Sequence, residues 1–217
     1  SRSRADASTR SVEHAPSRDA STMQSLDTAP RALRAAYVAA TQAEAARDAR
    51  YRMARDSNRR AVTAHGGDLR LSARFDRRGA TFRAPGIDGR LDARTLRCDG
   101  RSIALQEGEP TVDADAANRV RSTRAGRGSN AYLDEWYVAG PLGFEHGFDV
   151  SAPSCEREIA VELDVRGLVP RLQDDAVRPA SPHGDAAPRY ADPVAHDAEG
   201  RAPESSPSLE AGRIARI

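Results

Sequence analysis

The nineteen residues from Tyr132 to Val150 constrain this chain more than any other stretch. They hold the only tryptophan, two of the five tyrosines and two of the four phenylalanines. Aromatic side chains bury the largest apolar area per residue, so we expect this segment to anchor the core. Three glycines and one proline separate the aromatic residues and indicate tight turns and close approach of the backbone.

Large apolar residues are concentrated in the middle of the chain. Leu, Ile, Val and Phe make up 34 of the 217 residues, about 16%, which is below the ~20% of ordinary globular composition. Of these 34 residues, 23 lie between Leu69 and Val169. The distribution predicts one core with poorly ordered ends. We divide the chain into a disordered lead (1–26), a helical segment (27–65), a β domain (66–170) and a Pro-rich tail with edge strands (171–217).

A helix is predicted at the start of the second segment. Asp27 or Thr28 can cap it, and Pro30 lies near the first turn, where a missing N–H costs little. The pattern predicts that the helix continues to about Arg55. Its expected apolar stripe recurs every three or four residues and consists of Leu33, Ala36, Tyr37, Ala40 and Ala43.

After Gly66-Gly67 the apolar period becomes two, which is typical of half-buried strands. Residues 69–76 and 158–165 both alternate in this way. Asp88-Gly89 and Asp99-Gly100 indicate type I′ turns, and the second of these predicts a hairpin of 95–98 with 101–105. We therefore predict a mainly β fold, an antiparallel meander or sandwich with one N-terminal helix and an irregular C-terminal tail.

Charge gives no indication of a nucleic-acid partner. The chain contains no lysine, and 25 arginines face 16 acidic residues in 1–130, against 8 and 16 in 131–217. The two parts can attract each other within one molecule, but the balanced total predicts no concentrated basic face. Arg119, Arg121, Arg124 and Arg127 are predicted to lie on a solvated hairpin. No apolar run is long enough to span a bilayer.

Two cysteines, Cys98 and Cys155, leave two alternatives open. They can form one disulfide in an oxidising compartment, or they can remain two buried thiols. The start, Ser-Arg-Ser-Arg, has neither an initiator methionine nor a signal peptide. We expect either that a leader was removed or that the chain is part of a longer protein.

The aromatic segment carries polar residues that could be assembled into a site, namely Asp134, Glu135, Glu145 and His146. Their spacing matches no metal motif, and exposed carboxylates at turns and strand ends explain them equally well. The glycines at 140, 143 and 147 lack the lysine and the following helix of a phosphate-binding loop. We therefore predict no catalytic residue, no metal and no cofactor.

The segment Glu135–Phe148 resembles the signature EWY-N-GPLG-EQGF, which occurs in the N-terminal region of large secreted bacterial proteins with FG-GAP, or integrin-alpha-like, repeats. Residues 190–201 look like a second element of that family, Y-x-L-x-A-x-DAxGR. Ala139 stands where asparagine is usual, and His146 stands where glutamine is usual. Pro193 enters a segment that is a strand in the family.

The resemblance implies a non-catalytic module of a secreted or cell-surface protein that supports recognition or adhesion. Its partner would be a surface ligand or neighbouring domains of the same polypeptide. The residues with a structural or binding role would be Trp136, Tyr137, Gly140, Pro141, Gly143, Gly147 and Phe148. The alternative is a carbohydrate-binding or hydrolytic domain that uses the Trp136 region. A sugar-stacking role needs an exposed Trp136, whereas a structural anchor has it buried.

Overall fold

The structure is a computed structural model that describes residues 29–58, 60–67, 70–152, 155, 157–173, 176–180, 207–210 and 213–216. It is mainly β, and its strand pairs are antiparallel, as the sequence predicted. Within these residues the helical elements are α2 (Arg31–Glu44) and two 3₁₀ turns, Ala45–Arg47 and Ala49–Tyr51. The strands are β1 (Ala54–Arg55), β2 (Val62–Gly66), β3 (Leu71–Asp76), β4 (Gly79–Ala84), β5 (Ile87–Cys98), β6 (Arg101–Ala104), β7 (Thr111–Val112), β8 (Arg119–Ala125), β9 (Tyr132–Gly140), β10 (Gly143–Ser151), β11 (Ile159–Arg166), β12 (Val169–Gln173), β13 (Ala176–Ala180), β14 (Pro207–Glu210) and β15 (Arg213–Arg216).

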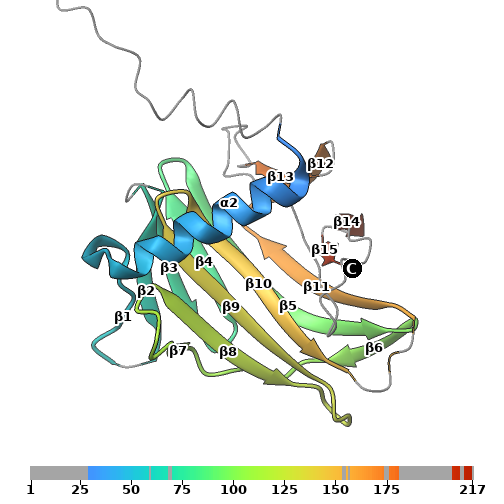
Figure 1. The fold of residues 1–217 in the computed structure, drawn as a ribbon. Helices are drawn as coiled ribbons and strands as arrows, with labels where there is room; N and C mark the ends of the chain where they lie inside the picture. The colour runs from blue at the N-terminus through green and yellow to red at the C-terminus, as the bar shows by residue number, and fades with distance from the viewer. Residues whose placement is uncertain are drawn as a thin grey trace, which may run out of the picture.

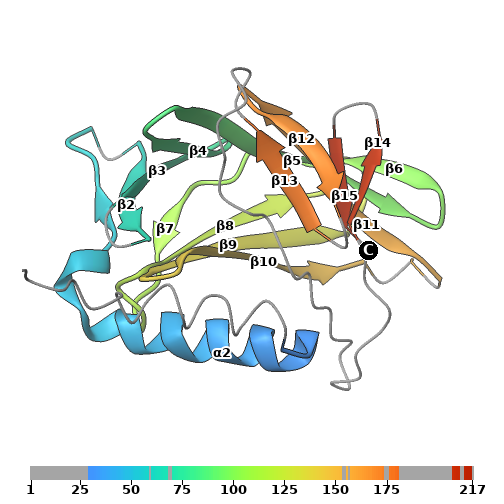
Figure 2. The same ribbon diagram turned by 90° about the horizontal axis from the view of Figure 1, so that it is seen from above.

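The described strands form two main sheets, and α2 adds a third layer. The larger sheet has the order β1-β2-β3-β4-β5-β11-β15-β14, with β6 also paired to β5, so β2 to β5 make a meander. The smaller sheet has the order β10-β9-β8-β7. Figure 1 shows α2 crossing the smaller sheet, and Figure 2 shows that sheet between α2 and the larger sheet. Strands β12 and β13 form a separate pair.

The core lies between the two sheets in two clusters. In the first, the ring of Phe75 on β3 lies 4.8 Å from that of Tyr137 on β9 and 5.9 Å from that of Phe144 on β10. In the second, Leu96 and Leu163 of the larger sheet pack with Leu133 of the smaller sheet, and all three are fully buried. The aromatic segment anchors both clusters because its two strands cross the whole sandwich.

The predicted hairpin after Asp99-Gly100 is confirmed. Cys98 pairs with Arg101, and both turn residues have positive φ, 48° and 79°. The turn predicted at Asp88-Gly89 is wrong, because both residues lie inside β5. A Cβ on Gly89 would lie 2.2 Å from Cδ1 of Leu168, so this glycine allows a side chain to pack closely on the strand.

The helix differs from the prediction in its end and in its buried face. It ends at Glu44 rather than near Arg55, and the chain continues in two 3₁₀ turns. The predicted stripe (Leu33, Ala36, Tyr37, Ala40 and Ala43) is exposed. The opposite face is turned to the sheet, and on it Gln42 is 1% exposed. Nε2 of Gln42 donates to the carbonyls of Val138 and Gly143, so hydrogen bonds rather than the apolar stripe orient α2.

The β structure begins before residue 66, because β1 and β2 already belong to the larger sheet. Within the tail, β14 lies at the edge of that sheet, where edge strands were expected, and Pro207 is its first residue. The lead at 1–26 and the second family-like element at 190–201 lie outside the described residues.

We predict that Gly140 and Gln42 are energetically coupled. A Cβ on Gly140 would lie 2.0 Å from Oε1 of Gln42, so Gly140→Ala must displace the amide that holds α2. Gly140→Ala and Gln42→Ala should each lower the free energy of unfolding by about 1–3 kcal/mol. The double variant should lose less than the sum of the two, because both substitutions remove the same hydrogen bonds. Urea unfolding of the four proteins measures this, and additive losses would contradict it.

Candidate functional site

The aromatic segment forms the β9–β10 hairpin, in which alternate residues point to opposite faces. On β9, residues 133, 135, 137 and 139 are buried between the sheets, whereas 134, 136 and 138 are partly exposed on the side of α2. Glu135 and His146 share the inner face, while Asp134 and Glu145 lie on the outer face. The four polar residues of the segment therefore do not converge on one point.

Glu135 is the centre of a buried polar cluster. Its side chain is 2% exposed and accepts a hydrogen bond of 2.9 Å from Nε of Arg124, whose side chain is also 2% exposed. The hydroxyl of Tyr137 donates to Oε1 at 2.8 Å, and Nε2 of His146 lies 3.1 Å from the same oxygen. The His146 ring stacks on Tyr137 with 4.0 Å between the centroids. Both carboxylate oxygens are thus occupied by partners from three adjacent strands.

These partners keep Glu135 ionised. Burial by itself raises the pKa of Glu135, but the hydrogen bond and charge of His146, the charge of Arg124 and the Tyr137 hydroxyl outweigh it and lower the pKa to about 2. The usual value is 4.5, so Glu135 stabilises the fold fully above that pH. This contribution is lost as the pH falls through about 2. Such a group suits a structural ion pair and not a proton donor near neutral pH.

Trp136 lies on the outer face of the smaller sheet and is partly buried. Its ring rests on the backbone of β10, where a Cβ on Gly147 would lie 2.1 Å from Cζ2. The guanidinium of Arg119 lies 4.7 Å from the ring centroid, in cation–π geometry. Neither of the two pockets described below is lined by Trp136. Nearby Glu145 has a raised pKa because it is half-buried, and Arg119 opposes the shift.

The other residues singled out in the segment have packing and turn roles. Tyr137 lies in the first core cluster, and Phe148 packs against the second. Gly140 and Gly143 face each other across the tight turn that contains Pro141. The structure therefore brings these residues together as one hairpin and not as the walls of a cleft.

Cys98 and Cys155 form a disulfide, which resolves the alternative left open by the sequence. Cys98 ends β5 and is fully buried, and Cys155 lies in the segment that leads to β11. Because β5 and β11 are neighbours in the larger sheet, the bridge fixes the end of their pairing. Closing a loop of this length stabilises a fold by about 4 kcal/mol in the chain-entropy model.

The basic run of β8 is only partly solvated, so its interpretation needs a correction. Arg119 and Arg121 are partly buried on the outer face, and Arg127 is exposed. Arg124 is buried and paired with Glu135. Alternation along β8 places Arg124 on the inner face together with Val120 and Ser122. A buried arginine is tolerated there because Glu135, on the neighbouring strand β9, neutralises its charge.

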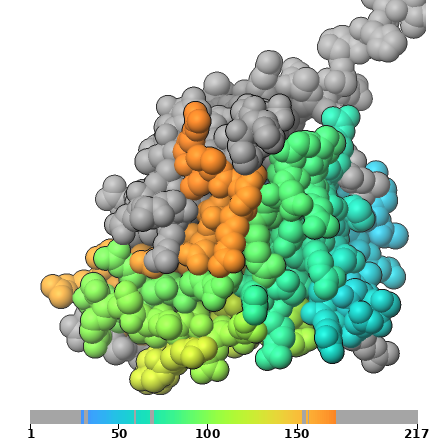
Figure 3. All heavy atoms as spheres, turned by 180° about the vertical axis from the view of Figure 1, so that it is seen from behind, coloured from blue at the N-terminus to red at the C-terminus, as the bar shows by residue number. Residues whose placement is uncertain are grey.

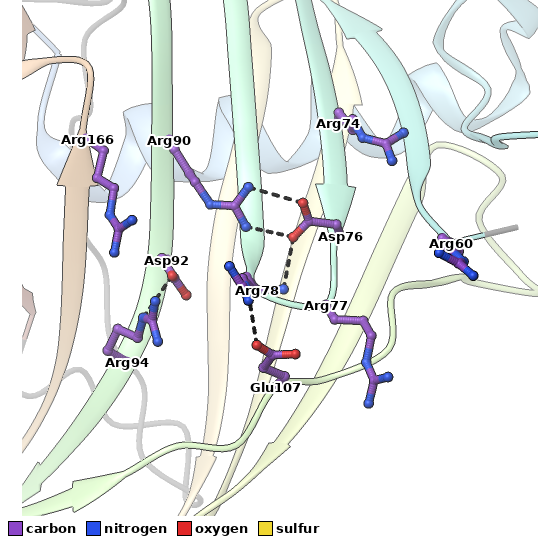
Figure 4. Close-up of a pocket in the computed structure, with 10 residues that line it drawn as sticks. All are labelled: Arg60, Arg74, Asp76, Arg77, Arg78, Arg90, Asp92, Arg94, Glu107 and Arg166. Carbon is purple, nitrogen blue, oxygen red and sulfur yellow. Dashed lines mark hydrogen bonds and ion pairs between the residues drawn. The ribbon is translucent and has the colours of Figure 1, made fainter. Parts of the chain in front are cut away.

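A pocket lined by arginines lies on the outer face of the larger sheet, and sequence reasoning did not predict it. Its volume is about 530 Å³. Figure 3 shows this face of the molecule, with β5 in green and β11 in orange, and Figure 4 shows the pocket. The lining contains seven arginines and three carboxylates, which are Arg60, Arg74, Arg77, Arg78, Arg90, Arg94, Arg166, Asp76, Asp92 and Glu107. A second pocket of about 420 Å³ shares Arg77 and Glu107 with it.

Each carboxylate of the pocket is paired with an arginine. Asp76 accepts two hydrogen bonds from Arg90, at 2.6 and 3.1 Å, and Glu107 accepts one from Arg78 at 3.0 Å (Figure 4). Burial opposes ionisation of Asp76, but the pairing with Arg90 lowers its pKa overall. Three acids outside the lining also contact its arginines, Asp56 with Arg74, Glu109 with Arg77 and Asp164 with Arg94. Seven arginines thus face six carboxylates, and within the described part of the chain the side chains of Arg60 and Arg166 have no ion pair. The pocket is therefore suited to an anion.

Asp92 is the most buried of these carboxylates, with its side chain 3% exposed. Nε of Arg94 lies 2.8 Å from it. Burial raises the pKa of Asp92, although the charges of Arg94, Arg124 and Arg90 act in the opposite direction. A shifted carboxyl group in a pocket is typical of functional sites. The sequence signal for this site is two arginines four residues apart, 90 and 94, on one strand, but its neighbours on β3 and β11 are brought close only by strand pairing.

Among the described residues, no group of three or more His, Cys, Asp or Glu side chains could hold a metal ion. Within the same residues, no helix has the length and apolar character needed to cross a bilayer. Comparison with family models, with curated proteins and with solved structures finds no match to this chain.

We predict that Trp136 contributes to folding. Trp136→Ala should lower the free energy of unfolding by about 2–4 kcal/mol, because it leaves a void above Gly147. Tyr132→Ala is the matched control, since Tyr132 lies on the same strand and face but is 43% exposed. Its cost should stay below about 1 kcal/mol. Urea unfolding measures both, and a Trp136→Ala protein as stable as the control would contradict the packing role.

Proposed function

We propose that this chain is a non-catalytic module of a secreted or cell-surface protein and that it supports recognition or adhesion. The observation that carries the proposal is the structural role of the Tyr132–Val150 segment, whose side chains pack and pair within the fold. Its Glu135 and His146 pair with each other between the sheets, and its Trp136 packs on Gly147. The most distinctive residues of the chain thus stabilise a rigid sandwich, and a rigid sandwich can present a binding surface on its outer faces.

The disulfide supports an extracellular place for the module. Disulfides form and persist in oxidising compartments and are rare in the cytosol, where thiols are kept reduced. Cys98–Cys155 joins the end of β5 to the segment that leads into its neighbour β11, so the bridge is part of the larger sheet's framework. The same compartment is implied by the resemblance to the secreted FG-GAP proteins.

The residues that carry the resemblance have physical roles compatible with it. The usual glutamine of the signature is replaced by His146, and a glutamine amide could donate the hydrogen bond that His146 provides to Glu135. The usual asparagine is replaced by Ala139, whose carbonyl accepts from Asn118. In this interpretation the partner is a surface ligand or a neighbouring domain of a longer bacterial polypeptide.

The alternative, a carbohydrate-binding or hydrolytic domain at Trp136, has less support. Stacking on a sugar needs an accessible ring face, and this ring already contacts Gly147 and the guanidinium of Arg119. A glycosidase needs two carboxyl groups on one side of a cleft, whereas Glu135 is sealed in the core and Glu145 lies on the outer face.

We predict that intact source cells expose the protein or release it into the medium. Brief protease treatment of intact cells should remove it, as followed by immunoblotting with an antibody against the chain. Alkylation without prior reduction, followed by peptide mapping, should recover Cys98 and Cys155 as one linked peptide. Protection from protease until the cells are lysed, together with alkylation of both thiols, would contradict the proposal.

A further inference from the structure

Two arginines of the pocket on the larger sheet lie where their positive charges repel each other. Arg90 on β5 and Arg166 on β11 are directly opposite each other in the strand pairing. Like charges at opposite positions of antiparallel strands destabilise a sheet. Asp76 pairs with Arg90 from one side, but Arg166 is exposed and has no carboxylate partner among the described residues.

The next pair along the same two strands shows how the fold resolves such a conflict elsewhere. Asp92 and Asp164 are also opposite each other, two residues away from the arginine pair. There Arg94 bridges them, with its Nε 2.8 Å from Asp92 and 3.8 Å from Asp164. One arginine thus lies between the two acids, whereas Asp76 contacts Arg90 alone and no described carboxylate bridges Arg90 and Arg166.

We propose that this pocket binds a sugar that carries a carboxylate, with the carboxylate held between Arg166 and Arg90. The inference rests on the proposed recognition role and adds to it the site and the ligand class. A guanidinium binds a carboxylate through two parallel hydrogen bonds, so an oxyanion from outside supplies the missing counter-charge.

The rest of the lining fits the hydroxyl groups of a sugar. Asp76 and Glu107 keep 30% and 45% of their side chains exposed, and carboxylate oxygens accept hydrogen bonds from hydroxyls. The volume of about 530 Å³ is in the range of small-ligand sites. No aromatic residue is among the described residues that line the pocket, which favours a hydrated, charged ligand over bases that need a stacking platform.

The surrounding carboxylates also disfavour a long chain of phosphates. Asp76, Asp92 and Glu107 lie among the arginines, so a continuous polyanion would pass close to three negative charges. A uronate sugar carries one carboxylate per ring, so one carboxylate can lie at the arginine pair while the neutral hydroxyls of that ring lie near the acids. We therefore favour a uronate-type sugar over a nucleic acid.

The test uses the 217-residue chain and three probes, which are trigalacturonate, maltotriose and a short single-stranded oligonucleotide. Calorimetry at low salt should show binding of trigalacturonate and none of maltotriose. The affinity should fall only mildly with salt, because few ions are released. Arg166→Ala should weaken binding by at least about tenfold, since it removes a charged hydrogen-bond donor.

Arg83→Ala is the matched control. Arg83 projects from the same sheet, is 67% exposed and lies outside the pocket, so its loss should leave the affinity for trigalacturonate unchanged. Arg166→Ala should also keep or slightly raise the melting temperature, because it relieves repulsion from Arg90. A purely structural arginine would lower it.

Four results would overturn the inference, and the first three concern trigalacturonate, the arginine variants and the oligonucleotide. These are no binding of trigalacturonate, equal binding by both arginine variants, or tighter binding of the oligonucleotide with a steep loss in salt. The first two would leave an extracellular recognition role intact, because cell-surface exposure and the disulfide are measured separately. Equal binding of maltotriose would show that the carboxylate is not recognised.

Discussion

Glu135 is an ionised carboxylate between two packed sheets, and an ion in such a place is tolerated only with partners. Its partners come from β8, β9 and β10, so the pairing of these three strands must have one register for the cluster to close. A slip of one residue would turn Arg124 or His146 to the opposite face and leave the charge unpaired. The cluster therefore determines the strand register of the smaller sheet and also stabilises that sheet.

The remaining architecture follows from this fixed sheet. Its inner face meets the larger sheet through Phe75, Tyr137 and Phe144. Its outer face receives α2 through the hydrogen bonds of Gln42. The outer face of the larger sheet carries arginines and carboxylates, among them Asp76, Arg90 and Arg166. A charged outer face on a rigid, disulfide-linked sheet is where we place ligand recognition.

Local patterns in the sequence predicted correctly those elements that depend on neighbouring residues alone. Alternation identified β3, whose Ala73 and Phe75 are buried, and Asp99-Gly100 identified a turn because positive φ is a property of those residues. The helix face was wrong because the alanine stripe offers little area, while Gln42 finds backbone carbonyls that only the folded sheet provides. The turn predicted at Asp88-Gly89 was wrong because the glycine instead gives room to Leu168, almost eighty residues away in the chain, which packs on the strand there.

The site was less predictable than the fold for the same reason. In the sequence Arg124 does not differ from an exposed arginine, because its buried partner Glu135 lies eleven residues later in the chain. The arginine pocket draws its lining from β3, β5, β11 and three connecting segments, so the grouping of its arginines is invisible in a balanced composition. Strand pairing, which a single sequence does not reveal at this range, creates both.

The most direct test of this account is the titration of Glu135 itself. In protein labelled with ¹³C at the glutamate side chains, NMR can follow the carboxyl resonance of Glu135 from pH 7 downwards. We predict that it stays ionised through pH 3 and titrates near 2, or that the protein unfolds while Glu135 is still charged. A midpoint at or above the usual value of 4.5 would contradict the structural ion pair and would indicate a carboxyl group poised to give up a proton.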